Sequence, residues 1–149
     1  MPFAEWYSYL PKNTPVIVEP KIDGCAMALR YVDGILVKAW TRKGVDKTYC
    51  MRMIEDLPKY ILARGTVEIR GELYGKGLIP ARSQRLAAGH LRKKQPSGMG
   101  LSFCAFQIFN GKGTEITNLR QLAKWGFLVT GYIKAVSYTH LTLPTSQLV

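Results

Sequence analysis

Hydrophobic and polar positions alternate along several segments of this chain, which indicates strands that bury one face. The alternation, together with β-branched and aromatic composition, predicts strands over residues 15–19, 25–31, 35–41, 66–74 and 101–109. An Asp33-Gly34 pair separates the second and third of these segments. Such a pair is typical of a tight hairpin, because both residues tolerate a positive φ. Gly71 stands inside the fourth segment and indicates a break there.

Helical spacing of apolar residues predicts helices over residues 49–57, 80–94 and 117–125. In the second helix we expect an inward stripe of Leu86, Ala87 and Leu91, with the basic residues facing out. For the third we expect a threonine cap, a stop at Gly126 and an inward face of Leu119, Leu122 and Ala123. Strands and helices interleave around hairpins, so the predicted class is α+β with an antiparallel sheet.

Length and composition limit the chain to one globular domain. It has 149 residues, of which 47% are hydrophobic, so disordered and collagen-like classes are excluded. No apolar run reaches the roughly 18 residues that a membrane span needs, and the first residues lack a signal-peptide pattern. We therefore expect a soluble, cytoplasmic monomer with no membrane partner. Cys25, Cys50 and Cys104 are odd in number and far apart, which favours buried thiols over disulfides or a metal site.

The net charge is +11, from 21 Lys and Arg against 10 Asp and Glu, and the excess is uneven. Residues 73–114 contain no acidic side chain. The basic residues of that stretch are Lys76, Arg82, Arg85, Arg92, Lys93, Lys94 and Lys112. Such a strip attracts polyanions, and a solvated basic face of an ordinary enzyme is an equally good interpretation of the charge alone.

The segment Glu19-Pro20-Lys21-Ile22-Asp23-Gly24 carries the strongest candidate chemistry. If the strand continues through it, alternation places Glu19, Lys21 and Asp23 on one face. A lysine between two carboxylates is also a common surface ion pair, so this motif is weak by itself. Further along stand Arg42, Arg70-Gly71-Glu72 and the aromatic segment 103–109. Together they supply what nucleotidyl transfer needs: a lysine nucleophile, carboxylates, a cation for phosphate and a ring for a base.

Over residues 11–129 the sequence resembles the adenylation domain of the NAD-dependent DNA ligases. The matching pieces are EPKIDG (19–24), LRYVDGILVKAWTR (29–42), VEIRGELY (67–74), LAAGHLRKK (86–94), LSFCAF (101–106) and LAKWGF (122–127). The first and third motifs are common to covalent nucleotidyl transferases, whereas AAGxLR and LxxWGF point to the NAD-dependent branch. The resemblance implies an antiparallel-sheet nucleotidyltransferase fold, ATP-grasp-like and incomplete at the C-terminus.

The resemblance also assigns roles to residues. Lys21 would be the nucleophile that forms a lysyl-AMP phosphoramidate, with Asp23 and Glu72 serving the ribose, a Mg²⁺ ion or the transition state. Glu19, Ile22, Arg42 and Phe106 would bind the AMP part of NAD, Glu19 through the adenine amine and Phe106 by stacking. For Phe106, plain core packing is an equal alternative. The nucleic-acid contacts, with nicked duplex DNA as the partner, would come from Arg82, Arg85, Arg92, Lys93 and Lys94.

Lys21 needs activation, because only about one free lysine in 2,500 is neutral at pH 7 when its pKa is about 10.4. Nearby carboxylates raise that pKa further, so partial burial, a Mg²⁺ ion held by the carboxylates, or both must oppose them. We expect little reaction without the metal.

The sequence departs from the family pattern in two places. Arg82-Ser83-Gln84-Arg85 stands where an Asn-Pro-Arg-Asn run is usual, so Gln84 replaces an expected arginine and Arg82 or Arg85 is a candidate substitute. The loop after Arg42 also lacks the usual Gly-Asp-Gly-rich form, which puts its NAD or DNA contacts in doubt.

We expect residues 1–136 to be part of an adenylation domain and residues 137–149 to be a foreign or disordered tail, with a native strand and short tail as the alternative. As a fragment, the chain should not seal nicks by itself. Two rival functions stay open: an ATP-dependent DNA or RNA ligase, and a non-catalytic basic domain that binds nucleic acid.

Overall fold

The computed structural model describes residues 5, 8–10, 16–131 and 133–135. The chain divides into two compact units, each described by itself. The larger comprises residues 22–129, and the smaller contains the described residues of 1–21 and 130–149. The predicted boundary after residue 136 and the predicted tail at 137–149 lie outside the described residues.

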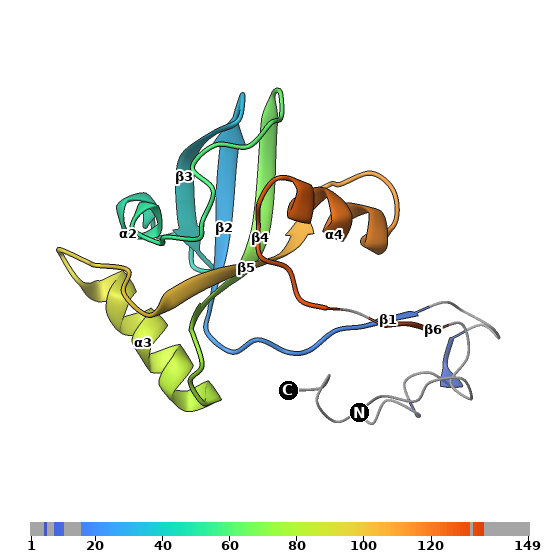
Figure 1. Cartoon of the computed structure of the whole chain (residues 1–149), viewed down its shortest axis with the longest axis horizontal. Helices are drawn as coiled ribbons and strands as arrows, with labels where there is room; N and C mark the ends of the chain where they lie inside the picture. Colours follow the sequence, from blue (N-terminus) through green and yellow to red (C-terminus); the bar gives the residue numbers. More distant parts are fainter. Residues whose placement is uncertain (1–4, 6–7, 11–15, 132, 136–149) are drawn as a thin grey trace. The chain divides into compact units, whose positions relative to one another are not determined.

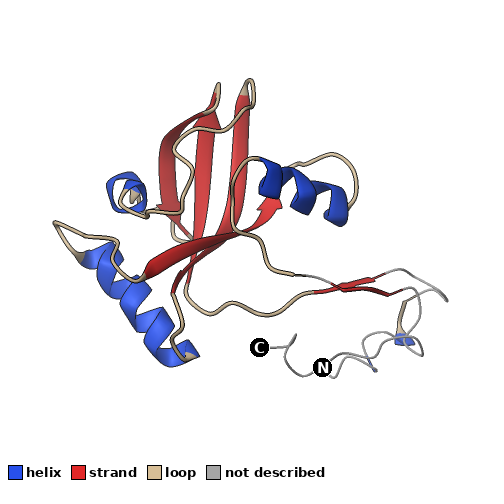
Figure 2. Cartoon of the chain, viewed as in Figure 1, coloured by secondary structure: helices blue, strands red, loops and turns tan. Residues whose placement is uncertain are grey.

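A four-stranded antiparallel sheet forms the larger unit, with the strand order β3-β2-β4-β5 (Figure 1). The strands are β2 (Cys25–Val32), β3 (Ile35–Thr41), β4 (Thr66–Gly75) and β5 (Leu101–Ile108). The helices are α2 (Thr48–Arg52), α3 (Pro80–Arg92) and α4 (Glu115–Lys124). Figure 2 shows them around the sheet. The α+β class with an antiparallel sheet is thus confirmed.

One face of the sheet is buried and the other is open. Alternate residues of β2, Met27, Leu29 and Tyr31, are buried on the core face. Phe127, which follows α4, packs edge-on against Tyr31 and Phe103 of that face, with ring centroids at 5.8 and 6.4 Å. The intervening residues of β2 point to the opposite face, because successive side chains of a strand alternate.

The β2–β3 hairpin turns at Asp33 and Gly34, whose φ angles are 47° and 86°. Both values lie in the left-handed region, as expected for an Asp-Gly hairpin. Asp33 also holds the loop before β4: Gly65 N–H donates to its carboxylate at 2.9 Å, and its own N–H donates to the Gly65 carbonyl at 2.9 Å. The hairpin predicted from the sequence is confirmed.

Both outer strands of the sheet are met by neighbouring chain along their free edges. On β3, Trp40 forms a bridge with Asp46, and Ile35 forms one with Tyr60. On β5, the Ala105 N–H donates to the carbonyl of Leu128 at 2.8 Å.

In the smaller unit, β1 (Val16–Val18) pairs antiparallel with β6 (Ile133–Ala135). The predicted strand over 15–19 is therefore too long at its C-terminal end, and residues 19–23 have no regular secondary structure. The expectation that strand alternation places Glu19, Lys21 and Asp23 on one face is wrong. Pro20 explains the end of the strand, since it has no N–H to donate to a ladder.

Two predictions, one about β4 and one about α2, need correction. Gly71 does not break its strand, because β4 runs through it from Thr66 to Gly75. A Cβ at Gly71 would lie 2.1 Å from the Cys104 carbonyl oxygen and 2.5 Å from the Phe103 ring, so the glycine is needed for close packing. Helix α2 ends at Arg52, well before Pro58, and the Asp56 carboxylate beyond it accepts hydrogen bonds from the Ser102 hydroxyl and the Phe103 N–H.

The inward faces of α3 and α4 also differ from the prediction. In α3, Ala87 and Leu91 are buried as expected, but Leu86 is 37% exposed. Two polar residues, Ser83 and His90, complete the buried stripe, and an apolar pattern cannot reveal them. In α4, Leu119 and Leu122 are buried and Ala123 is exposed. The cap is Thr114, whose hydroxyl accepts from the Thr117 N–H, and Gly126 at φ 97° follows the helix.

Cys50 and Cys104 are buried and Cys25 is half-buried, all as free thiols. Within the described ranges, no helix has the length and apolar character to cross a membrane.

Candidate functional site

A cavity of about 400 Å³ lies on the open face of the sheet. Its floor includes Ala26 and Ala28 of the central strand β2. In the sheet register, Ala28 stands between Trp40 of β3 and Arg70 of β4, two much larger residues. The hollow exists because the central strand presents two methyl groups where its neighbours present long side chains.

Side chains of the other three strands and their ends form the walls. Trp40 and Arg42 line the cavity from β3 and its end, Arg70 and Glu72 from β4, and Phe106 from β5. The predicted residues Arg42, Glu72 and Phe106 therefore share one cavity. Phe106 is half-buried there, so it lines this space and is not enclosed in the core.

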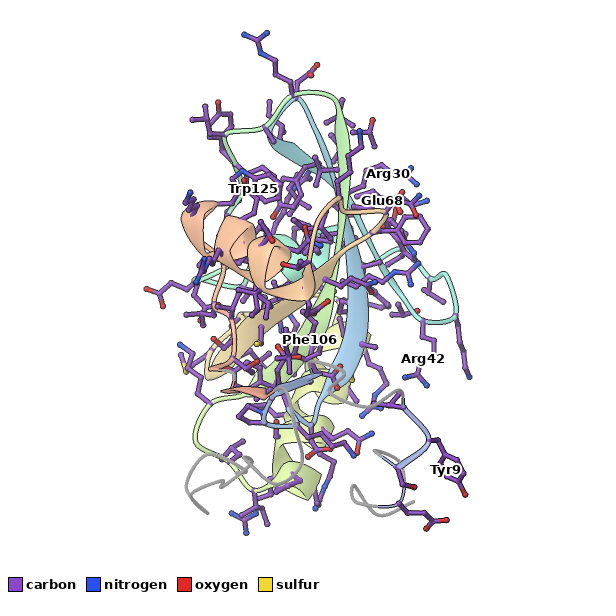
Figure 3. The ribbon with its side chains drawn as sticks, turned by 90° about the vertical axis from the view of Figure 1, so that its right-hand side faces the viewer. Tyr9, Arg30, Arg42, Glu68, Phe106 and Trp125 are labelled. Atoms are coloured by element: carbon purple, nitrogen blue, oxygen red, sulfur yellow. The ribbon has the colours of Figure 1, made fainter. Side chains whose placement is uncertain are left out.

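Cations and rings continue from the cavity across the open face. The Arg30 guanidinium lies over the Trp40 ring, 5.1 Å from its centroid, and pairs with the Glu68 carboxylate at 2.8 Å. Figure 3 shows Arg30 beside Glu68, with Arg42 on the same side of the ribbon. Arg70 lies 4.5 Å from the centroid of the Phe109 ring. These contacts limit the conformational freedom of the arginine side chains, because a guanidinium stacked on a ring is held in place.

Glu72 is held by the backbone just after Asp23. Its Oε2 accepts a hydrogen bond from the Gly24 N–H at 3.0 Å. Gly24 itself lies so close to β4 that a Cβ there would be 1.9 Å from the Leu73 carbonyl oxygen. The glycine therefore lets the segment containing Asp23, which is half-buried, run directly beside the strand that carries Glu72.

The pKa of the Cys25 thiol responds to two charged side chains, Glu72 and Arg92. Burial is the main reason that the pKa of the Cys25 thiol is raised, and the Glu72 carboxylate raises this pKa further. The Arg92 guanidinium acts in the opposite direction and lowers it. Both charges therefore act on one thiol, Glu72 from β4 and Arg92 from the end of α3.

The remaining predicted cations of the strip are exposed. On α3 these are Arg82 and Arg85, and Lys93 and Lys94 follow the helix. The prediction that basic residues of this helix face outward is confirmed. Their contact with a nucleic acid stays a prediction.

Glu19 and Lys21 belong to the smaller unit, and both side chains are exposed. In that unit the Thr130 hydroxyl donates to Glu19 Oε1 at 3.5 Å. Half-buried Ile22 begins the larger unit, so the peptide bond between Lys21 and Ile22 joins the two units. The roles predicted for Glu19, Lys21 and Ile22 remain predictions.

Sequence reasoning gave no role to Trp40 or Ser83, and it named Arg70 only as part of the Arg70-Gly71-Glu72 motif. Trp40 and Arg70 line the cavity, and period-two alternation from Arg42 and Glu72 could have found them. Ser83 is buried, and its hydroxyl donates to the Asp23 carbonyl oxygen at 2.7 Å. Nothing in the local pattern of α3 marks that contact, because the two residues are far apart in the chain.

This arrangement suits a flat, anionic ligand. Aromatic side chains offer faces for a heterocycle, Arg42 and Arg70 offer charge to an anion, and a carboxylate accepts hydrogen bonds from hydroxyl groups. Among the described residues, no group of three or more His, Cys, Asp or Glu could hold a metal ion. Any divalent cation bound by Asp23 and Glu72 would thus take its further ligands from water or from the phosphates of the ligand.

Comparisons with known proteins agree with this chemistry. Residues 4–78, just over half of the chain, match the model of the family described as the NAD-dependent DNA ligase adenylation domain. A DNA ligase of Stenotrophomonas maltophilia is 34% identical over 81% of the chain, and one of Pseudomonas fluorescens SBW25 is 32% identical over 78%. DNA ligase 1 of Nocardia farcinica is 35% identical over 78%. The chain spans only about a fifth of these relatives, 18%, 18% and 20% of their lengths.

Proposed function

Because the chain belongs to the NAD-dependent DNA ligase adenylation domain family, we propose that it carries the lysine-adenylation site of a nick-sealing ligase. Its cavity would hold the AMP part of NAD. The observation that carries the proposal is the cavity itself, where Arg42, Glu72 and Phe106 meet. The resemblance to the ligase family assigns Arg42 and Phe106 to AMP binding and Glu72 to catalysis. The nucleotidyltransferase fold, ATP-grasp-like, is part of the same proposal.

Each wall residue would bind a different part of the nucleotide. Phe106 would stack on the adenine, as aromatic side chains do on bases. Glu72, fixed by the Gly24 N–H, would accept a hydrogen bond from a ribose hydroxyl. Arg42 and Arg70 carry the positive charge of the walls and would face the phosphates. Glu19 would accept from the exocyclic amine of adenine.

Lys21 would attack the α-phosphorus of NAD. The new bond joins Lys21 Nζ to the α-phosphorus. The P–O bond of the pyrophosphate bridge breaks and releases nicotinamide mononucleotide, and the proton that the lysine loses goes to water. Lys21 is exposed and two residues from Asp23 in the sequence. A metal ion bound near it would oppose the charged form of its amino group.

Asp23 and Glu72 fit a Mg²⁺ ion by their donor chemistry. Magnesium prefers one or two carboxylates and completes its shell with water and substrate phosphates. When bound, the ion would neutralise charge that develops on the phosphate. Two half-buried carboxylate residues on adjoining backbone supply that set without a third protein ligand.

Replacing Lys21 tests the nucleophile. In the intact ligase that contains this chain, Lys21→Ala should abolish the AMP adduct that intact-mass spectrometry detects after incubation with NAD and Mg²⁺. The matched control is Lys124→Ala, an exposed lysine of α4, which should leave the adduct unchanged. An adduct that persists in Lys21→Ala would exclude this residue as the nucleophile.

The floor of the cavity tests the nucleotide site separately. Ala28→Leu adds three carbon atoms to the floor and should weaken AMP binding by roughly tenfold or more, since bulk there removes space that the ligand needs. Titration of the chain with AMP, followed by Trp fluorescence, would measure this loss. Ala123→Leu, on the exposed side of α4, is the control and should bind AMP like the wild type. Equal affinity of the two variants would place the AMP site elsewhere.

The family match favours NAD over ATP as the donor, and a direct comparison separates the two. The intact enzyme should form the adduct with NAD and not with ATP. An adduct with ATP alone would support the ATP-dependent alternative. The non-catalytic alternative predicts no adduct with either donor and undiminished DNA binding.

A further inference from the structure

Ser83 is a buried polar residue in the first turns of α3, with only 4% of its surface exposed. Its hydroxyl donates to the Asp23 carbonyl oxygen at 2.7 Å and accepts from the Gly75 N–H at 2.9 Å. One side chain therefore links α3 to the last residue of β4 and to the segment that precedes β2. These bonds satisfy two backbone groups, the Asp23 carbonyl and the Gly75 N–H.

Two hydrogen bonds hold consecutive residues beside β4. The Asp23 carbonyl is bound by Ser83, and the Gly24 N–H is bound by the Glu72 carboxylate at 3.0 Å. Strand β4 lies close to the segment before β2 at Gly24 and close to α3 at Gly75. A Cβ at Gly24 would lie 1.9 Å from the Leu73 carbonyl oxygen, and one at Gly75 would lie 3.2 Å from the Ser83 Cα.

We infer that Ser83 is a positioning residue for the candidate site. Its hydroxyl fixes the Asp23 backbone against β4, and this in turn sets the Gly24 N–H that orients the Glu72 carboxylate. The path from Ser83 to the cavity is thus two hydrogen bonds and one peptide unit long. Ser83 is not among the residues that line the cavity.

The test compares two buried serines in the full chain. Ser83→Ala removes the link to Asp23 and Gly75. Ser102→Ala removes the hydroxyl bound to Asp56, in a residue that is 1% exposed and does not line the cavity. Both lose a buried hydrogen bond, so both should lose some global stability. Only the first should disturb the segment at 23–24.

Amide hydrogen exchange and chemical shifts, measured by NMR, give the decisive readout. In Ser83→Ala the Gly24 and Gly75 amides should exchange roughly tenfold faster than the loss of global stability explains, and the Gly24 amide shift should move. In Ser102→Ala the exchange rates of both amides should change only as much as the loss of global stability explains. An unchanged Gly24 amide in Ser83→Ala, or the same change in both variants, would overturn the inference.

AMP binding connects the positioning role of Ser83 to the nucleotide site, and this expectation rests on the proposed function. Ser83→Ala should weaken AMP binding severalfold, whereas Ser102→Ala should not. A wild-type chain that binds no AMP would overturn the proposed occupant of the cavity, while the exchange of Gly24 and Gly75 would still decide the role of Ser83. If Ser83→Ala does not fold, the wild type decides: unprotected Gly24 and Gly75 amides in the folded chain would refute the contact.

Discussion

At the scale of single residues, the Cys25 thiol is a natural reporter of the charges at the site. Alkylation follows the thiolate fraction, and burial and Glu72 keep the pKa of this thiol raised while Arg92 lowers it. At a fixed pH near 8, Arg92→Ala should therefore slow alkylation of Cys25 by iodoacetamide severalfold. Glu72→Gln should accelerate it. Peptide mass spectrometry distinguishes Cys25 from the buried Cys50 and Cys104.

The control for this experiment is Arg85→Ala, an exposed cation of the same helix that does not contribute to the shift at Cys25. It should leave the alkylation rate unchanged. Equal slowing by Arg85→Ala and Arg92→Ala would mean that Cys25 responds to the overall charge of α3 and not to Arg92 in particular.

The site residues that the sequence could identify are charged residues at strand ends and a ring in an aromatic strand. Arg42, Glu72 and Phe106 stand at strand ends or in an aromatic strand, and the structure brings them to one cavity. Ala26 and Ala28 escaped notice, because a small residue defines a hollow only through its larger neighbours. Ser83 escaped because its partner Asp23 is 60 positions away, and no local pattern contains that contact.

At the scale of elements, the short helix α2 should respond to acid through Asp46. The Thr48 N–H and hydroxyl both donate to the Asp46 carboxylate, at 2.9 and 2.7 Å, and these bonds lower the pKa of Asp46. A carboxyl with a lowered pKa in the folded state adds stability above its unfolded pKa of about 3.9. That stability is lost as the pH falls through the folded value.

Denaturation midpoints of wild type and Asp46→Asn, measured from pH 7 to pH 2, test this. The difference between the two should be largest at pH 7 and should shrink at the acid end. Glu55→Gln, at an exposed carboxylate near the same helix, serves as the control for net charge. A difference that stays constant down to pH 2 would contradict the role of Asp46.

Among the elements, strands and the hairpin were predictable, and helix ends and faces were less so. The bounds of β3 agree with the predicted 35–41 because alternation and the Asp33-Gly34 turn coincide there. The predicted helix over 49–57 ends early at Arg52, and the Asp56 carboxylate beyond it accepts hydrogen bonds from β5. The sequence near Asp56 does not reveal that long-range partner.

At the scale of the whole molecule, the cations exposed along and after α3 should bind duplex DNA through its phosphates. If about four phosphates are neutralised, the slope of log K against log salt should be near −4. The double variant Arg92→Ala with Lys93→Ala should flatten this slope. Titration against a nicked fluorescent duplex at several salt concentrations measures it.

The matched double variant Arg120→Ala with Lys124→Ala removes the same charge from exposed positions of α4. Its slope should equal that of the wild type. If both double variants flatten the slope equally, the chain binds DNA by net charge, and the strip on α3 is an ordinary solvated face.

The division of the chain into two units was the part of the architecture that sequence could not predict. The segment 19–24 reads as one motif, yet the unit boundary falls between Lys21 and Ile22. Pairing of β1 with β6 joins residues more than a hundred positions apart, and nothing in either short strand specifies that partner.

The bridges along the outer strands of the sheet carry a consequence for self-association. An uncovered edge strand offers a ladder of free backbone groups on which a second molecule can grow, the first step toward fibres. Here β3 meets Asp46 and Tyr60, and β5 meets Leu128, along those edges. The sheet therefore resists edge-to-edge growth by steric occupation, and loosening the segment at Leu128 would expose the β5 edge as a template for aggregation.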